Sequence, residues 1–248
     1  MKVGITGSKG FIGSYLTKAL LNSGYTISEW DLKDGRDIKD FSVSGLDYVV
    51  HLAAYANVRQ SIKDPQKYWI NNVEYTTEIQ KQCHYNQVPL LYASSSCIHR
   101  WWLSPYGTTK KVNEETAFPN QVALRFTTVY GDGARDTMLI PKLLDGSVTY
   151  LTNHIRDFVH VDDVIDAILI LMRQDIRLKR AYDIGTGTGV LVSDLGPIAG
   201  YSDLTIKDGD PCEALDNTAD NSSMKDLGWE PKYDVEKYVH VKTSGENI

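Results

Sequence analysis

The amino-acid sequence predicts an α/β protein with a doubly wound parallel sheet and a small C-terminal lobe. Three observations support this fold class. A β-rich run at residues 2–6 leads through a glycine-rich turn into a helical pattern. The runs at 48–54 and 88–93 are almost entirely apolar, which is typical of strands buried on both faces of a sheet. Residues 190–248 are polar and rich in Asp and Asn, so they can form a small lobe but not an independent core.

Length, charge and cysteine content exclude several classes of protein. The chain has 248 residues, 42% of them hydrophobic, which suits one large α/β domain or a domain with a smaller companion. Its formal charge of −6, with no segment rich in Lys and Arg, argues against binding to nucleic acids or membrane surfaces. Cys83, Cys97 and Cys212 are odd in number and far apart, which indicates free thiols in a reducing compartment. With no cleavable apolar leader and no membrane-length apolar run, we expect a soluble, cytoplasmic protein, and we assign no metal site.

The first element is the β-rich run at residues 2–6, followed at once by a glycine turn and a helix. Gly7 would permit the tight turn, Gly10 would let the backbone approach a pyrophosphate, and Gly13 would let the helix pack closely on the strand. The helix N-terminus would then point free N–H groups at the phosphates. These are the parts of a Rossmann-type dinucleotide site, to which we assign Gly7, Gly10, Phe11, Ile12 and Gly13.

The second β-rich run ends at Asp31, at the distance from the glycines where an acidic group accepts hydrogen bonds from a ribose 2′-hydroxyl. A 2′-phosphate would be repelled there, so the sequence favours NAD over NADP. Alternatively, Asp31 only caps a loop, and the neighbouring Lys33 and Arg36 weaken the case against NADP. In the short element that follows, Asp37 could meet the adenine amino group, and we assign Asp37 and Ile38 to the cofactor site.

The apolar run at 48–54 predicts a central strand. The small side chains of Ala53 and Ala54 at its end leave room for a ligand to pass close to the backbone. We therefore assign Leu52, Ala53 and Ala54 to the cofactor site. His51 lies inside the run, where a single His is more often a satisfied core residue than a catalyst.

Asp64 and Pro65 open a helical pattern that continues through Gln80, with Pro suited to the first turn. Asn71 and Asn72 fall in the middle of this helix, where Asn is a poor helix former. We predict that one of them pairs with backbone or water near the site. We assign Asn71 to the cofactor site.

The strand predicted at 88–93 delivers the serines of residues 94–97 to the carboxyl edge of the sheet, where ligands bind in open α/β sheets. These hydroxyls could polarise a substrate alcohol or carbonyl, but serines also simply end strands. A short loop at 99–105 follows. Its Trp101 and Trp102 could line the mouth of the site or cover a contact between subunits.

Tyr106 and Lys110 are four residues apart, so on a helix they share one face. A phenol normally loses its proton near pH ~10, but a neighbouring cation or a positively charged nicotinamide favours the phenolate. Such a Tyr can act as a base near neutral pH. Taken alone, the pair would more often be an exposed Tyr and Lys at the start of a surface helix.

With the glycine turn, Asp31, the serine cluster and the Tyr-Lys pair in this order, the chain resembles the extended short-chain dehydrogenase/reductases, in particular the NAD-dependent epimerase/dehydratase family. The resemblance continues at residues 71–73, 124–131, 156–164, 182–187 and 227–231. It implies NAD as the cofactor and a nucleotide-diphosphate sugar as the substrate. We also expect a homodimer.

Carried over by position, the resemblance makes Tyr106 the base, Lys110 its electrostatic partner and ribose contact, and Ser95 the hydroxyl that orients the reacting oxygen. It implies that Arg156 holds the diphosphate, a task suited to a guanidinium group. Read without the family, Arg156 beside Asp157 would be an ordinary surface pair. The substrate-binding positions implied in this way are Ser96, Thr128, Arg156 and Lys207.

The chain departs from the family at several of these positions. Dehydratases place an acidic pair where this chain has Ser96 and Cys97, so a 4,6-dehydratase is disfavoured. Cys97 is similar to the reactive Cys of GDP-fucose synthases, but Met138 stands where they have His, and we rank that alternative lower. Thr128 replaces the family's Asn, and Lys207 replaces an Arg that often grips the diphosphate.

We therefore expect residues 1–131, completed by 156–186, to form an NAD-binding domain. Residues 132–155 and 187–248 would form a reduced substrate-binding lobe, with the active site in the crevice between. The leading hypothesis is a nucleotide-sugar 4-epimerase working through a transient 4-keto sugar. The alternatives are a nucleotide-sugar reductase or decarboxylase of the same family and, from another class, a non-catalytic NAD-binding sensor or scaffold.

Overall fold

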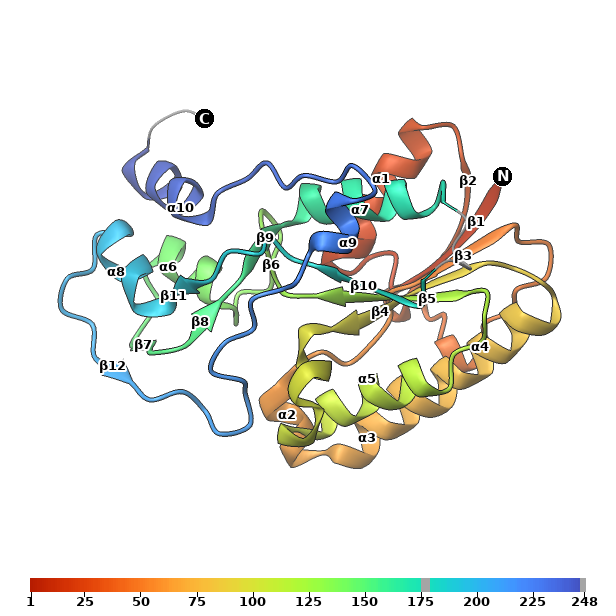
Figure 1. Ribbon diagram of the computed structural model, residues 1–248, viewed down its shortest axis with the longest axis horizontal. Coiled ribbons are helices and arrows are strands. Elements are labelled where there is room, and N and C mark those ends of the chain that lie inside the picture. Colours follow the sequence, from red (N-terminus) through yellow and green to blue (C-terminus); the bar gives the residue numbers. More distant parts are fainter. Residues whose placement is uncertain (175–178, 246–248) are drawn as a thin grey trace.

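The computed structural model describes residues 1–174 and 179–245. A six-stranded parallel sheet forms the centre of the larger part, with helices on both faces, and a smaller lobe lies at one end (Figure 1). In spatial order the strands are β10 (Ala181–Ile184), β5 (Gln121–Phe126), β4 (Leu90–Ser95), β3 (Tyr48–His51), β1 (Lys2–Thr6) and β2 (Thr26–Trp30). This arrangement confirms the predicted doubly wound α/β fold.

The strand order reverses next to β1, because β2 pairs with one of its edges and β3 with the other. Ligands in open α/β sheets bind at such a switch point, outside the carboxyl ends of the strands. The predicted strand at 48–54 ends three residues early, at His51. The Leu52 N–H still donates to the Thr6 carbonyl, so residues beyond the strand remain close to the glycine turn.

The two faces of the sheet are covered by different helices. Helices α1 (Phe11–Asn22) and α7 (Val161–Leu171) pack against each other on one face. The opposite face is covered by α3 (Pro65–Trp69), the π-helical segment η3 (Ile70–Tyr75), α4 (Thr76–Tyr85) and α5 (Pro105–Glu115). The helix predicted from Pro65 onward is thus present, but it contains a π-helical insertion. Two further elements, α2 (Val58–Lys63) and the 3-10 segment η4 (Ser96–Leu103), lie where no helix was predicted.

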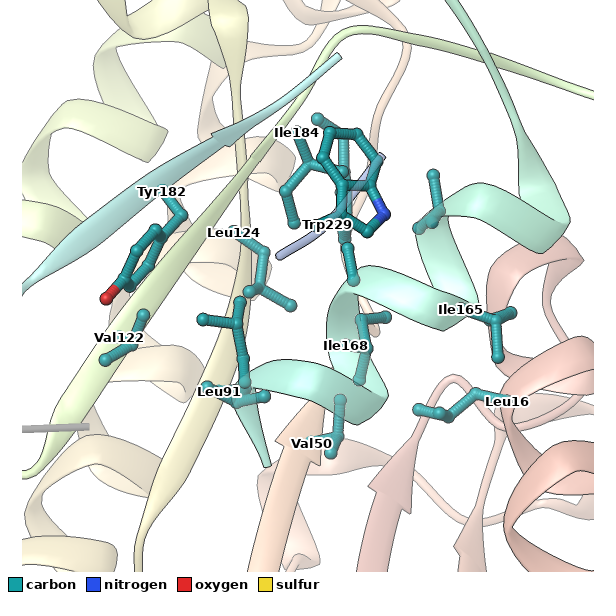
Figure 2. Close-up of a cluster of buried hydrophobic side chains, with 14 of the residues drawn as sticks. Leu16, Val50, Leu91, Val122, Leu124, Ile165, Ile168, Tyr182, Ile184 and Trp229 are labelled. Carbon is teal, nitrogen blue, oxygen red and sulfur yellow. The ribbon is translucent and has the colours of Figure 1, made fainter. Parts of the chain in front are cut away.

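The main core lies between the sheet and the α1–α7 pair. Figure 2 shows Ile168 of α7 among aliphatic side chains of the sheet that include Val50 and Leu91. Trp229, from the last part of the chain, is buried in the same cluster, and its indole N–H donates to the Asp163 carbonyl at 2.9 Å. The C-terminal region therefore returns to the sheet and stabilises it.

A second, smaller core holds the lobe together. It contains Tyr130, Leu143, Leu195 and Val239. The lobe is built from α6 (Leu139–Asp145), β7 (Leu151–Thr152), β8 (Ile155–Arg156), β11 (Val190–Leu191), α8 (Leu195–Ile198), β12 (Ile206–Lys207) and α10 (Val235–Ser244). Strand β7 pairs with β12 and β8 with β11, so the segments before and after the last sheet strand are joined. The proposed domain boundaries remain a prediction.

Asp157 links the lobe to the sheet and is not the surface residue that its neighbourhood in the sequence suggested. The side chain is fully buried. Its carboxylate accepts hydrogen bonds from the Thr186 N–H and hydroxyl at 2.7 and 2.8 Å, the Gly187 N–H at 2.9 Å and the Ala219 N–H at 3.1 Å. A buried carboxylate is stable only when it is paired in this way.

In residues 1–174 and 179–245, no helix has the length and apolar character needed to span a membrane.

Candidate active site

The glycine turn has the shape that the sequence predicted. Gly7 adopts a φ of 70°, and a Cβ on it would lie 2.9 Å from the Ala53 backbone nitrogen. A Cβ on Gly13 would lie only 2.0 Å from the Gly7 carbonyl oxygen, so only glycine lets α1 approach the turn this closely. The Gly10 N–H donates to the Gly7 carbonyl at 2.9 Å, and Gly10 precedes the first residue of α1, Phe11. This turn of bare backbone at a helix N-terminus fits a dinucleotide pyrophosphate. Contacts of Phe11 and Ile12 with the cofactor remain predictions.

Asp31 is held beside the glycine turn. Its two carboxylate oxygens accept hydrogen bonds from the Lys9 and Lys33 backbone N–H groups, both at 2.9 Å. It therefore caps the loop, as the alternative interpretation stated, while its carboxylate stays fixed next to the turn. The Lys33 ammonium donates to the Lys9 carbonyl at 2.8 Å, and the Arg36 guanidinium to the Glu29 carbonyl at 2.8 Å. Both neighbouring cations thus have backbone carbonyls as partners, and the role of Asp31 as a ribose ligand remains a prediction.

The other positions assigned to the cofactor are Asp37, Ile38, Leu52, Ala53 and Ala54. Asp37 caps the short turn η2 (Ile38–Asp40), and the Ile38 side chain is buried in a core cluster. The Ala53 N–H donates to the Thr6 hydroxyl at 3.3 Å, which places its backbone against Gly7. Ala53 is therefore held next to the glycine turn, and the cofactor contacts of the whole set remain predictions.

His51 is a satisfied core residue, as the sequence suggested. Its two ring nitrogens lie 2.6 Å from the Thr6 hydroxyl and 2.9 Å from the Thr76 hydroxyl. Burial lowers the pKa of His51 to about 3, and the charge of Lys110 acts in the same direction. A ring held neutral by two hydroxyl partners has no free nitrogen for proton transfer.

Asn72, and not Asn71, is the asparagine that pairs with the backbone. Asn72 is fully buried, its side-chain oxygen accepts from the Tyr55 N–H at 2.9 Å, and its amide donates to the Tyr55 carbonyl at 2.9 Å. The same amide lies 3.3 Å from the Thr109 hydroxyl in α5. Asn71 donates to the Asn72 side-chain oxygen at 2.9 Å. The preference for Asn71 as the pairing residue was wrong, because the π-helical insertion turns its neighbour inward; a cofactor contact of Asn71 remains a prediction.

Helix α5 carries Tyr106 and Lys110 into the interior. Ser104 caps the helix by accepting from the Gly107 N–H at 3.1 Å, and the Tyr106 N–H donates to the Ser61 hydroxyl of α2 at 3.1 Å. The side chains of Tyr106 and Lys110 are buried, so the pair is not the exposed surface pair of the alternative interpretation. The Lys110 ammonium lies 5.8 Å from the centre of the Tyr106 ring.

Ser95, at the end of β4, lies beside Tyr106, and its hydroxyl lowers the pKa of the phenol. Its hydroxyl also accepts from the Cys97 N–H at 3.1 Å, which fixes the side chain. The Lys110 ammonium donates to the carbonyl of Ala93, in the same strand, at 2.7 Å. The structure therefore brings together the three residues proposed as catalytic, although the loop between Ser95 and Tyr106 is short.

The electrostatics of Tyr106 differ from the expectation. Burial raises the pKa of the phenol above its ordinary value, as does the neighbouring Cys97, while the Ser95 hydrogen bond and the charge of Arg135 lower it. Lys110 is not among the groups that lower the pKa of Tyr106. Burial lowers the pKa of Lys110 to about 8. In the protein alone, burial therefore disfavours the phenolate of Tyr106.

Ser96 and Thr128 lie on the side of the site that faces the C-terminal region. Asn217 connects them, because its amide lies 3.5 Å from the Ser96 hydroxyl and 3.2 Å from the Thr128 hydroxyl. The Asn217 side-chain oxygen accepts from the Asp157 N–H at 2.8 Å. No pattern in the sequence pointed to Asn217, since it lies almost 90 residues from Thr128 along the chain.

Arg156 and Lys207 both belong to the lobe, in β8 and β12 respectively. The Arg156 guanidinium forms an ion pair with Glu213 at 3.0 Å, and Glu213 also pairs with Arg59 of α2 at 3.0 Å. The Lys207 ammonium lies 4.1 Å from the centre of the Tyr150 ring. Sequence reasoning identified neither Arg59 nor Glu213. Arg156 and Glu213 both affect the pKa of Cys97, so this cluster lies close to the end of β4.

Comparison with known proteins identifies the family of this site. The model of the NAD dependent epimerase/dehydratase family matches residues 3–101 and 103–185. A UDP-glucose 4-epimerase of Pisum sativum is 26% identical, covering 95% of this chain and 93% of the relative. That alignment runs over 328 positions, while this chain has 248 residues, so the relative contains segments that this chain lacks.

Two solved structures are similar over almost their whole length. MoeE5 in complex with UDP-glucuronic acid and NAD is 27% identical with a TM-score of 0.88, and 98% of each chain is covered. A mutant of UDP-glucuronic acid 4-epimerase from Bacillus cereus, in complex with UDP-4-deoxy-4-fluoro-glucuronic acid and NAD, is 26% identical with a TM-score of 0.87 and the same coverage of 98%. The fold is therefore shared with both structures.

Proposed function

Because this chain belongs to the NAD-dependent epimerase/dehydratase family of enzymes, we propose that it is a nucleotide-sugar 4-epimerase that keeps NAD bound through the reaction. The observation that carries the proposal is the position of Ser95 beside the buried Tyr106, with Lys110 one helical turn away. Ser95 lies at the carboxyl end of β4, which only β3 separates from β1, where the strand order reverses and ligands bind.

Each of the three proposed catalytic residues has its own role in the reaction. Tyr106 removes the proton from the sugar 4-hydroxyl and later returns it to the same oxygen, while Ser95 donates a hydrogen bond to that oxygen. Lys110, whose ammonium is held by the Ala93 carbonyl, would contact the ribose of the cofactor. Because burial raises the pKa of Tyr106, a positive charge added nearby would favour the phenolate.

The residues present fit the cofactor of the family. The glycine turn with Gly7, Gly10 and Gly13 would hold the pyrophosphate of NAD, and Asp31 would hold the adenosine ribose. When bound, NAD supplies reversible oxidation of a sugar carbon and a positive charge that favours the phenolate. Arg156, Lys207, Ser96 and Thr128 would hold the nucleotide-diphosphate sugar.

Several observations favour epimerisation over the other reactions. Two of the similar proteins are 4-epimerases by name, one for UDP-glucose and one for UDP-glucuronic acid. A dehydratase would need an acid and a base after Ser95, but these positions are Ser96 and Cys97, and burial raises the pKa of the Cys97 thiol. We also propose that the protein is a homodimer and that it works in the cytoplasm. The free cysteines support the second statement, because thiols stay reduced in that compartment.

The first test is a screen of UDP-, GDP-, CDP- and dTDP-sugars by thermal shift, followed by analysis of the products. Inversion at sugar carbon 4 without net consumption of NADH or release of CO2 is the expected result. Net NADH consumption or CO2 release would identify a reductase or a decarboxylase instead. Tyr106→Phe should reduce turnover at least about 1,000-fold while leaving NAD binding nearly intact. Unchanged turnover would remove the mechanism, and NAD binding without any turnover in the native protein would favour a sensor or scaffold.

A further inference from the structure

One carboxylate occupies the position between two arginines from different parts of the fold. Residues 208–219, called here the strap, run from β12 of the lobe back toward the sheet and on to α9 (Ser222–Lys225), and pass α2 on the way (Figure 1). Glu213 lies in the middle of the strap. Its Oε1 is 3.0 Å from Arg59 Nε of α2, and its Oε2 is 3.0 Å from an Arg156 guanidinium nitrogen of β8. Glu213 thus closes a bridge between the sheet-bearing part and the lobe.

The Arg156 guanidinium is oriented by the backbone, because it donates to the Ala214 carbonyl at 2.8 Å and the Ile155 carbonyl at 3.0 Å. Only 13% of its side chain is exposed. Arg59 is 48% exposed and lies 3.4 Å from Asp210 as well as 3.0 Å from Glu213. The geometry is that of a preformed anion site with one buried and one accessible guanidinium, in which Glu213 is the anion.

His154 supplies an independent sign that this cluster is built for a ligand. It is 2% exposed, and its Nε2 has no hydrogen-bond partner in the part of the chain that the structure describes. A Cβ on Gly209 would lie 2.1 Å from that nitrogen, so the orphaned atom faces the strap. Buried polar atoms without partners are rare in folded proteins, and a bound water or ion is one of the explanations for them.

A third cation completes the surroundings of this site. The Lys207 ammonium rests 4.1 Å above the Tyr150 ring, and the Tyr150 hydroxyl is hydrogen-bonded to Arg59. Tyr150 therefore lies between Lys207 of the lobe and Arg59 of α2. When Glu213 moves away, the two guanidinium groups that it pairs with become available to another anion.

Arg156 is the diphosphate ligand of the proposed function; we propose that Arg59 shares this role and that Glu213 occupies their site until the substrate displaces it. The inference rests on the function proposed above and adds to it the residue that sets substrate affinity. A diphosphate oxygen and the Glu213 carboxylate compete for the same N–H donors. The two anions also repel each other, so Glu213 must rotate away or the strap must lift before the diphosphate binds.

The test compares Glu213→Gln with native protein in calorimetric titrations with UDP, GDP, CDP and dTDP, each protein saturated with NAD. Gln keeps the size of the side chain and removes its charge. Because the competitor becomes neutral, the dissociation constant of the best nucleoside diphosphate should fall about tenfold. Arg59→Gln should raise it about tenfold. Asp208→Asn is the matched control, because Asp208 lies on the same strap but accepts its hydrogen bond from Asn153, at 3.1 Å. The dissociation constant of this variant for the nucleoside diphosphate should stay within about twofold of the native value.

The possible outcomes separate this inference from the proposed function. An unchanged or weaker affinity in Glu213→Gln overturns the inference, while the epimerase proposal stands if a diphosphate still binds the native protein. If none of the four diphosphates binds to any of these proteins, both proposals fail. Unfolding temperatures are measured for each variant, and Glu213→Ala replaces Glu213→Gln if the latter does not fold, with the same expected direction.

Discussion

Replacing Asn72 tests whether the π-helical segment positions the catalytic helix. Asn72 joins the loop after β3 to α5 through its bonds with Tyr55 and Thr109. Asn72→Ala removes the partners of the Tyr55 N–H and carbonyl without changing the surface charge. Asn71→Ala is the control, because Asn71 is half-buried and its side-chain amide donates to Asn72 itself.

The magnitude follows from the groups left without partners. Each buried polar group that loses its partner costs about 1–3 kcal/mol, and the half-buried position of Tyr55 lets water replace part of that loss. The two backbone bonds together therefore correspond to about 2–4 kcal/mol. In a protein of this size that lowers the melting temperature by about 5–15 °C. For Asn71→Ala we expect the free energy of unfolding to fall by less than about 1 kcal/mol, and we expect weaker NAD binding.

The assay is thermal unfolding followed by circular dichroism, with hydrogen exchange of the Tyr55 amide as a local probe. Asn72→Ala should melt well below Asn71→Ala, and its Tyr55 amide should exchange faster than in the native protein. Equal melting temperatures for the two variants, or a lower one for Asn71→Ala, would refute the argument. So would an unchanged exchange rate at Tyr55.

Two further substitutions test the charges of the site. The folded pKa of Lys110 is depressed to about 8, so its burial destabilises the protein below pH 8, and this cost disappears as pH rises to 10.5. Lys110→Met should therefore raise the free energy of unfolding at pH 7 by up to about 3 kcal/mol, and it should abolish turnover. Urea unfolding is the assay, and an equal increase in the free energy of unfolding at pH 7 and at pH 10 would contradict this prediction. Asp31→Ala should raise the dissociation constant for NAD at least about tenfold and bring it closer to that for NADP, both measured by calorimetry. If the ratio of the two dissociation constants does not change, Asp31 only caps the loop.

The parts of the fold that local chemistry dictates could be predicted from the sequence. The glycine turn is an example, because the close approach of Gly13 to the Gly7 carbonyl admits no side chain. The Tyr106–Lys110 pair is another, since helical spacing alone places both residues on one face. The apolar runs likewise identified the central strands, although the boundary at His51 depended on where ladder pairing stops.

The parts that depend on distant contacts could not be predicted. The sequence could not distinguish Asn71 from Asn72, because both lie in a π-helical segment. Such a segment changes the direction in which a side chain points, and no sequence pattern predicted it. Glu213 and Asn217 meet their partners only when the strap folds back on the site. The raised pKa of Tyr106 likewise reflects burial by the whole fold and not the charge of its helical neighbour.

The most direct test of the account follows a deuterium label at carbon 4 of the nucleotide sugar through turnover in ordinary water. Tyr106 exchanges only the hydroxyl proton, so the hydrogen on carbon 4 should return to the same carbon. We predict an inverted product that retains the deuterium at that carbon. Loss of the label to the solvent, or inversion at full rate in Tyr106→Phe, would contradict the central claim.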